Sequence, residues 1–99
     1  MQRFEEPAKA IRATVGETFA IALAGNPTTG YTWHATVDPG HLELVGETFE
    51  PAGQGVGSGG KEVFRFRALA PGSSEIKCEY RRPWDKQARE SKRFRIEID

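Results

Sequence analysis

The stretch "EVFRFRALA", Glu62 to Ala70, alternates apolar and charged side chains with a period of two. Phe64, Phe66 and Ala68 fall on one face, and the two arginines between them fall on the other. This alternation is typical of a β-strand that has one face in a hydrophobic core and the other in solvent.

The same period recurs along the whole chain and predicts about seven strands. Besides the stretch above, the expected strands lie near Ala10–Val15, Phe19–Leu23, Tyr31–Val37, Leu42–Phe49, Glu75–Tyr80 and Arg93–Ile98. Asp85–Arg93 has no apolar stripe, and we expect a solvated loop or a strand extension there. Seven short strands in 99 residues predict an all-β fold, an immunoglobulin-like antiparallel β-sandwich that forms one domain over residues 1–99.

Composition and charge exclude several classes of partner. The 14 basic and 14 acidic residues balance, so no general positive field favours nucleic acid. No apolar run approaches the ~20 residues of a membrane span, and the first ten residues lack the apolar segment of a signal peptide. We expect a monomer without a cofactor or a membrane partner, and the compartment stays open.

The connections between the predicted strands differ sharply in character. The first, third and fifth, "VGET", "VDPGH" and "APGSS", are short ordinary turns. The second, fourth and sixth, "GNPTTG", "EPAGQGVGSGG" and "RRPWDKQARE", carry all the unusual sequence. Because alternate connections of an antiparallel sandwich emerge at opposite ends, we expect these three at one end, where they form a recognition surface.

The glycine loop matches two nucleotide-binding patterns, but its context excludes both. Gly55–Gly60 fits GxGxxG, and with Lys61 it fits GxxxxGK. Both patterns require a following helix, whereas a predicted strand follows here, and Glu62 replaces the Ser or Thr that holds magnesium. The loop is therefore either an ordinary flexible connection or a backbone surface that pairs with a partner.

The other two unusual loops also have a structural and a functional interpretation. "NPTTG", Asn26–Gly30, predicts a tight and rigid turn. In "RPW", Pro83 should end strand pairing, which leaves Trp84 either folded back on the core or exposed as a binding residue. Trp33 is expected in the core.

Catalytic chemistry is not indicated. Cys78 lies among inward positions of a strand and is expected to be an inert core thiol. His34 and His41 have no cysteine or carboxylate at a spacing that suggests a metal site. The many glutamates and arginines are expected on solvated faces. We therefore expect no enzyme and no metal.

Three motifs together resemble the chagasin family of cysteine protease inhibitors, which carries NPTTG with an aromatic residue, GxGG and RPW in this order. Here they are "NPTTGY" (Asn26–Tyr31), "GSGG" (Gly57–Gly60) and "RPW" (Arg82–Trp84). The resemblance implies a tight, reversible inhibitor of papain-family proteases, with the first loop in the catalytic cleft. The implied protease-binding residues are Asn26, Pro27, Thr28, Thr29, Gly30, Tyr31, Val56, Gly57, Ser58, Gly59, Gly60, Arg82, Pro83 and Trp84.

The family also implies a role for each loop. Thr28, Thr29 and Gly30 would sit at the enzyme's cysteine, Gly57–Gly60 would make backbone contacts, and the RPW tryptophan would pack against an aromatic of the enzyme. The alternative is an immunoglobulin-like adhesion or carbohydrate-binding module that uses Trp84 and Tyr31 as stacking platforms. Sugar binding favours several coplanar exposed aromatics, and the sequence offers one convincing candidate. A small hydrolase would need a nucleophile beside a base, and none is found.

Overall fold

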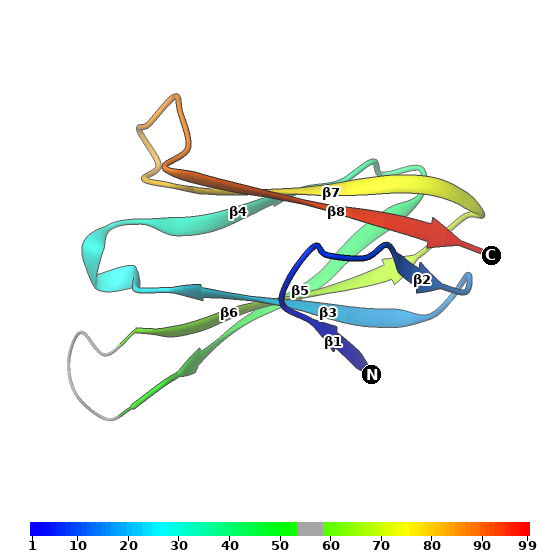
Figure 1. The fold of residues 1–99 in the computed structure, drawn as a ribbon, viewed down its shortest axis with the longest axis horizontal. Coiled ribbons are helices and arrows are strands. Elements are labelled where there is room, and N and C mark those ends of the chain that lie inside the picture. The colour runs from blue at the N-terminus through cyan, green and yellow to red at the C-terminus, as the bar shows by residue number, and fades with distance from the viewer. Residues whose placement is uncertain (54–58) are drawn as a thin grey trace.

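The structure is a computed structural model that describes residues 1–53 and 59–99, and two β-sheets face each other in it (Figure 1). Its strands are β1 (Gln2–Phe4), β2 (Ile11–Ala13), β3 (Thr18–Gly25), β4 (Thr32–Thr36), β5 (Leu42–Pro51), β6 (Gly60–Ala68), β7 (Gly72–Arg81) and β8 (Glu90–Ile98). The one helical element within these described ranges is a single 3₁₀ turn, η1 (Pro27–Thr29), between β3 and β4. No helix of the described chain is long and apolar enough to cross a bilayer.

One sheet has the strand order β1-β3-β6-β5 and the other has the order β2-β8-β7-β4. The predicted all-β, immunoglobulin-like sandwich is confirmed. Two details differ from the expectation. The described ranges contain eight strands, because β1 adds to the seven expected; β2 falls within the strand expected near Ala10–Val15. Both N-terminal strands pair in parallel, β1 with β3 and β2 with β8. The unexpected strand β1 is only three residues long, too short to show a period in the sequence.

The core lies between the sheets and follows from the register of the strands. Phe19 lies opposite Phe66, and Ile21 lies opposite Phe64, so the apolar positions of β3 and β6 share one face. The buried residues of this core are Ile11, Ala13, Phe19, Ile21, Leu23, Trp33, Leu42, Phe64, Phe66, Ala68, Ile76, Cys78, Phe94, Ile96 and Ile98. The predicted burial of Trp33 and Cys78 is therefore confirmed.

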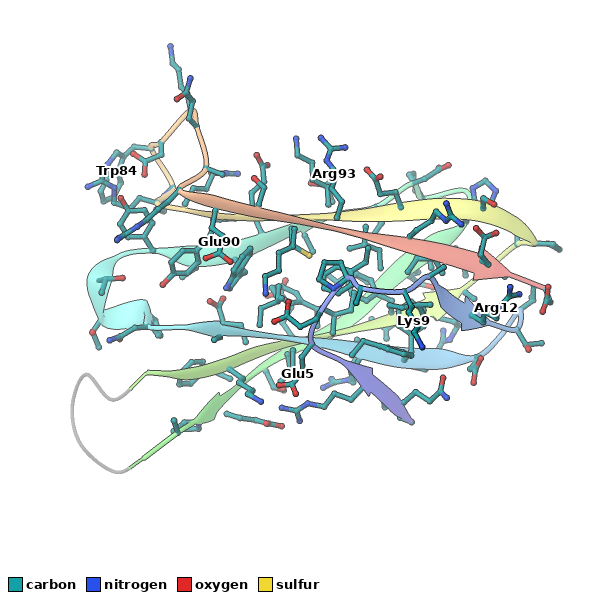
Figure 2. All side chains as sticks on the ribbon, in the orientation of Figure 1. Glu5, Lys9, Arg12, Trp84, Glu90 and Arg93 are labelled. Carbon is teal, nitrogen blue, oxygen red and sulfur yellow. The ribbon has the colours of Figure 1, made fainter. Side chains whose placement is uncertain are left out.

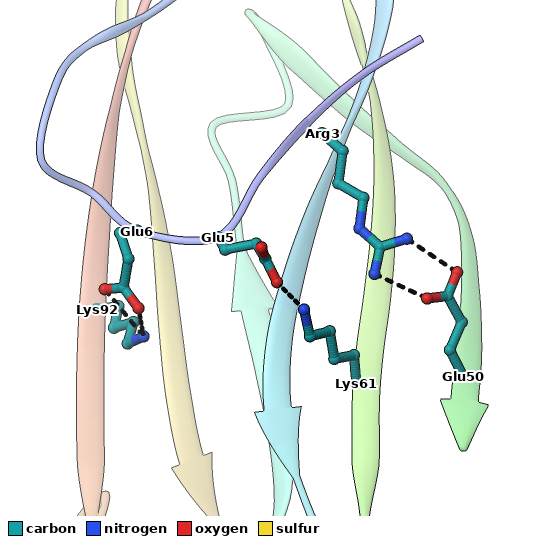
Figure 3. A network of polar contacts seen from close by, with 6 residues as sticks. All are labelled: Arg3, Glu5, Glu6, Glu50, Lys61 and Lys92. Atoms are coloured by element: carbon teal, nitrogen blue, oxygen red, sulfur yellow. Dashed lines mark hydrogen bonds and ion pairs between the residues drawn. The ribbon is translucent and has the colours of Figure 1, made fainter. Parts of the chain in front are cut away.

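The N-terminal segment crosses the edge of the sandwich and is tied to both sheets by ion pairs (Figure 3). Arg3 binds Glu50 of β5 with two hydrogen bonds, of 2.7 and 3.0 Å, and Glu5 pairs with Lys61 of β6. On the other sheet, Lys92 of β8 lies 3.3 Å from Glu6. Surface pairs of this kind contribute little to stability, so they orient the segment more than they stabilise the fold.

Candidate functional site

The first and third unusual connections and the described ends of the glycine loop, at Gly53 and Gly59, emerge at the same end of the sandwich, the left end in Figure 1, as the alternation of connections predicts. They also lie against one another. A methyl group built on Gly59 would lie 3.1 Å from the carbonyl oxygen of Gly25, and one built on Gly30 would lie 3.9 Å from Cγ of Arg82. Of the predicted site residues, Val56, Gly57 and Ser58 lie outside the described residues.

The turn Asn26–Gly30 is held by its own side chains. Asn26 caps η1, because its Oδ1 accepts from the backbone N–H of Thr28 at 3.2 Å and from the Thr28 hydroxyl at 2.6 Å. The backbone N–H and the hydroxyl of Thr29 both donate to the carbonyl of Asn26, at 3.1 and 2.7 Å. Gly30 ends the turn at φ +86°, a left-handed conformation that favours glycine. The turn is thus shaped before any partner arrives.

Both ends of the turn are fixed to the body of the sandwich by side chains of β4, β6 and β7. The Trp33 indole donates to the carbonyl of Ala24 at 2.9 Å, and the Tyr80 hydroxyl accepts from the backbone N–H of Asn26 at 3.2 Å. The backbone N–H of Trp33 in turn donates to the carboxylate of Glu62, 3.2 Å from each oxygen. The turn is therefore gripped by residues from both sheets.

Aromatic rings and arginines form a continuous stack beside the turn. Tyr31 stacks on Tyr80 with ring centroids 5.5 Å apart, and Tyr80 packs on Trp33 at 5.0 Å. The guanidinium carbon of Arg82 lies 5.2 Å from the Tyr31 ring and 5.4 Å from the Trp84 ring. Arg82 thereby joins the "RPW" loop to the "NPTTGY" loop through cation–π contacts.

The β7–β8 connection is closed by an arginine–aspartate pair. Arg82 donates to both carboxylate oxygens of Asp85, at 2.9 and 3.1 Å, and this pairing lowers the pKa of Asp85. Pairing of β7 ends at Arg81, two residues before Pro83, as predicted. Trp84, near the start of this loop and at the left end of the molecule in Figure 2, is 70% exposed. It therefore does not fold back on the core, and its ring is available to a partner.

The described glycines of the second loop allow the backbone to pass very close to its neighbours. Gly60 begins β6 between Gly25 and Pro51, and a methyl group on it would lie 2.2 Å from the carbonyl oxygen of Glu50. Gly59 has φ +74°, and its carbonyl accepts from the N–H of Ala52 at 3.0 Å. Only glycine fits this path, so Gly59 and Gly60 present backbone rather than side chains.

Glu62 is a part of the site that the sequence analysis missed. We expected glutamates to point to solvent, and for Glu62 this is wrong. Glu62 points to the same face of β6 as Phe64 and Phe66 and lies half-buried between the sheets. Burial is the main cause of its raised pKa. The period of two, extended by one step from Phe64, would have placed it inward; the charge obscured this signal.

Neither Cys78 nor His41 adds catalytic chemistry to this end. Cys78 is fully buried, and burial raises the pKa of its thiol to about 12, so it carries no thiolate near neutral pH. Nδ1 of His41 lies 2.9 Å from Oδ2 of Asp38, in the connection after β4 at the opposite end. Within the described ranges no group of three or more His, Cys, Asp or Glu side chains is placed to hold a metal ion.

Comparison with known sequences decides the family. The sequence model described as Chagasin family peptidase inhibitor I42 matches residues 12–98, which is most of the chain. The chain belongs to the chagasin family of peptidase inhibitors. The family predicted from the three motifs is confirmed, and so is the class of function, protein inhibition of peptidases.

Other members of the chagasin family resemble the chain in sequence. Chagasin of Trypanosoma cruzi is 32% identical over 94 residues, which cover 87% of this chain and 84% of the relative. Amoebiasin-1 of Entamoeba histolytica is 37% identical over 70 residues, which cover 70% and 69%.

Solved structures of similar fold are also inhibitors. The crystal structure of the cysteine protease inhibitor EhICP2 from Entamoeba histolytica superposes with a TM-score of 0.84 at 22% identity, covering 99% of this chain and 94% of that one. PbICP-C, whose structure is that of a complex with falcipain-2, gives a TM-score of 0.71 at 17% identity, covering 100% and 93%. At these identities the likeness supports the fold.

Proposed function

We propose that the chain is a tight, reversible inhibitor of papain-family cysteine proteases that blocks the active-site cleft with three loops, and that residues 1–99 act as one inhibitor domain. The observation that carries the proposal is the contact of the "NPTTGY", glycine and "RPW" loops at one end of a rigid sandwich. The relatives support the choice of target, since PbICP-C forms a complex with falcipain-2 and EhICP2 is a cysteine protease inhibitor.

The turn Asn26–Gly30 is suited to occupy a catalytic cleft without being cut. Cleavage requires a substrate carbonyl that faces the thiolate and can become tetrahedral. Here the carbonyls of Asn26 and Pro27 already accept hydrogen bonds from Thr29 and Gly30, at 3.1 Å from their backbone N–H groups. These hydrogen bonds hold both carbonyl oxygens within the turn, so presenting either one to the donors that stabilise an oxyanion would require the turn to rearrange. Thr28 and Thr29 are small and bring no charge that would be stranded on burial.

Trp84 and Arg82 are suited to grip the enzyme on one side of the turn. Exposed tryptophan and arginine are over-represented among residues that dominate binding energy. Arg82 donates a hydrogen bond to Asp85, and its guanidinium group lies against the Trp84 ring. These contacts restrict the orientation of the tryptophan before binding. Pro83 removes one freely rotating bond between Arg82 and Trp84. On the other side, we propose that Val56 and the backbone of Gly57–Gly60 contact the substrate-binding side, by the resemblance to the family.

The carbohydrate-binding alternative receives no support from the geometry. It requires Tyr31 and Trp84 as open stacking platforms. The Tyr31 ring already stacks on Tyr80, and the guanidinium groups of Arg82 and Arg89 lie 5.2 and 5.3 Å from its centroid. Trp84 alone remains as a platform. We also propose that the chain is no enzyme, since its one thiol, Cys78, is buried.

Titration of active papain with the purified chain tests the proposal. Three loops along a cleft can cover the ~800 Å² per partner of a standard interface, which is compatible with nanomolar affinity. We expect stoichiometric loss of activity at nanomolar enzyme, full recovery on dilution, and an intact chain by mass spectrometry after prolonged incubation. Full papain activity at micromolar concentrations of the chain would contradict the proposal, and steady cleavage of the chain would contradict its mechanism.

A further inference from the structure

Glu62 is a half-buried carboxylate whose main hydrogen bond runs from one sheet to the other. It belongs to β6, and it accepts from the backbone N–H of Trp33 in β4, an edge strand of the facing sheet, with both oxygens at 3.2 Å. Trp33 lies three residues after Gly30, the last residue of the turn. The carboxylate therefore fixes the backbone at the point where the chain leaves the proposed inhibitory turn.

The space beside this carboxylate is kept open by a glycine. A methyl group built on Gly25 would lie only 2.7 Å from Oε2 of Glu62, closer than any real contact allows. The next nearest atoms belong to Tyr80 and Trp33, at 3.5 and 3.6 Å, which are ordinary contact distances. Gly25 precedes the turn, as Trp33 follows it. Glu62 thus sits between the two ends of the turn.

The surroundings of Glu62 disfavour its charged form, so its charge does not stabilise the fold. Burial is the largest cause of its raised pKa, and the nearby charge of Glu47 on β5 acts in the same direction. Tyr80 faces the same space from β7. No ion pair to Glu62 occurs in the part of the chain that the structure describes. A half-buried carboxylate without an opposite charge lowers the stability of the fold. Its structural role is to accept the hydrogen bond from the backbone N–H of Trp33.

We propose that Glu62 is a positioning residue that sets the direction of the Asn26–Tyr31 loop by holding the Trp33 backbone. The proposal rests on the proposed inhibitory function for its consequence, because the loop it aligns is the one assigned to the protease cleft. Its physical content is independent of that function. Without the acceptor, the Trp33 N–H loses its partner, and the exit of the turn can shift relative to Arg82 and Trp84.

The first test compares two substitutions of the same residue. Glu62→Gln keeps an oxygen acceptor for Trp33, so we expect the inhibition constant against papain to stay within about threefold of the original chain. Glu62→Ala removes the acceptor, and the loss of one buried hydrogen bond corresponds to an inhibition constant about tenfold higher. Glu47→Ala is the matched control, since Glu47 is an exposed carboxylate on the neighbouring strand, and it should leave inhibition unchanged.

A second test moves the carboxylate without removing it. Gly25→Ala places a methyl group 2.7 Å from Oε2, so the carboxylate of Glu62 must shift from its present position beside the Trp33 N–H. We expect Gly25→Ala to reproduce the loss caused by Glu62→Ala, and to add little in the Glu62→Ala background. Such non-additivity is the signature of one shared interaction, and a merely general loss of stability would instead add.

Hydrogen exchange of the Trp33 amide gives a readout that does not depend on any protease. We expect exchange about tenfold faster in Glu62→Ala and Gly25→Ala, and close to the original rate in Glu62→Gln and Glu47→Ala. Unchanged exchange and unchanged inhibition in a folded Glu62→Ala chain would overturn the proposal. If the original chain did not inhibit papain at all, the proposed function would fail, while the exchange rates would still decide the role of Glu62.

Discussion

The two ends of the sandwich are built by different means. At the end opposite the candidate site, the backbones of connections bind each other or the end of a neighbouring strand. The N–H of Leu69 donates to the carbonyl of His41 at 2.8 Å, and the N–H of Gly16 donates to the carbonyl of Ala68, the last residue of β6, at 2.8 Å. At the site end, the backbone bonds of the described residues close one connection each, as between Arg89 and Tyr80 at 2.8 Å. There, the ring and cation–π contacts that join different connections depend on side chains.

This difference indicates which substitutions can separate function from stability. Backbone bonds between connections tolerate many side chains, so the far end can vary while the fold persists. The site end depends on particular groups, such as the Tyr80 hydroxyl on Asn26 and the Arg82 guanidinium between two rings. We therefore expect substitutions at the site end to affect inhibition more than folding, and those at the far end to leave inhibition unchanged.

The largest expected effect on inhibition comes from Trp84→Ala. Trp84 is 70% exposed, so its removal should change the free energy of unfolding by less than about 0.5 kcal/mol. Loss of a dominant binding residue costs about 2–4 kcal/mol, so the inhibition constant should rise at least about thirtyfold. Inhibition assays with papain and urea unfolding of the same preparation measure both quantities.

The control for Trp84 is an exposed apolar residue at the other end. Leu69, 40% exposed, precedes the turn between β6 and β7. Leu69→Ala should leave the inhibition constant unchanged. If Trp84→Ala and Leu69→Ala had the same effect on inhibition, Trp84 would not be part of the protease-binding surface.

Two glycines provide a matched comparison of intermediate size. Gly16 at the far end and Gly30 at the site end have φ values of +90° and +86°, and a methyl group would meet nothing within 4 Å at Gly16 and only Arg82, at 3.9 Å, at Gly30. Alanine at either position costs about 1–2 kcal/mol of stability through the left-handed backbone alone. We expect Gly30→Ala to raise the inhibition constant as well, about tenfold or more, because relief of that strain distorts the turn.

Gly16→Ala supplies the control for this prediction. It should lower the unfolding free energy by a similar amount while the folded fraction still inhibits papain with the original constant. Thermal unfolding and papain inhibition at 25 °C measure the pair. Equal inhibition by the two variants would mean that the shape of the Asn26–Gly30 turn does not matter for binding.

Much of the fold, and the end of the sandwich at which the candidate site lies, could be predicted from the sequence. The alternation of apolar and charged residues, as around Phe64 and Phe66, predicted the strands. The rule that alternate connections emerge at opposite ends predicted that the three motifs meet at one end. Both inferences depend on local patterns repeated along the chain, which makes them robust. The exposure of Trp84 was left between two possibilities, because a polar loop does not reveal whether an aromatic ring turns inward.

What the sequence did not reveal depends on contacts between distant strands. β1 pairs in parallel with β3, and β2 pairs in parallel with β8, because of where the N-terminal segment crosses the edge of the sandwich. The partner of a three-residue strand cannot be predicted from the alternation of its side chains. The inward direction of Glu62 was hidden because a charged residue in a strand usually faces water. Its hydrogen bond to Trp33, 29 positions away, exists only once the two sheets face each other.

The smallest and most specific prediction concerns two carboxylates at opposite ends, whose pKa values shift in opposite directions. Burial raises the pKa of Glu62, so its contribution to stability is fully present in acid and is lost as the pH rises through that raised pKa. At the far end, the N–H of Gly40 and the ring of His41 lower the pKa of Asp38. The contribution of Asp38 is therefore present near neutral pH and is lost as the pH falls through its lowered pKa.

Urea unfolding of the original chain, Glu62→Gln and Asp38→Asn at about pH 3 and pH 7 tests this opposition. Relative to the original chain, Glu62→Gln should be more stable at pH 7 than at pH 3, and Asp38→Asn should be less stable at pH 7 than at pH 3. All other titrating groups are common to the three chains, so their contributions cancel in the two differences. Differences of the same sign would show that the site end does not carry an uncompensated buried charge, and the contrast between the two ends would then rest on hydrogen bonding alone.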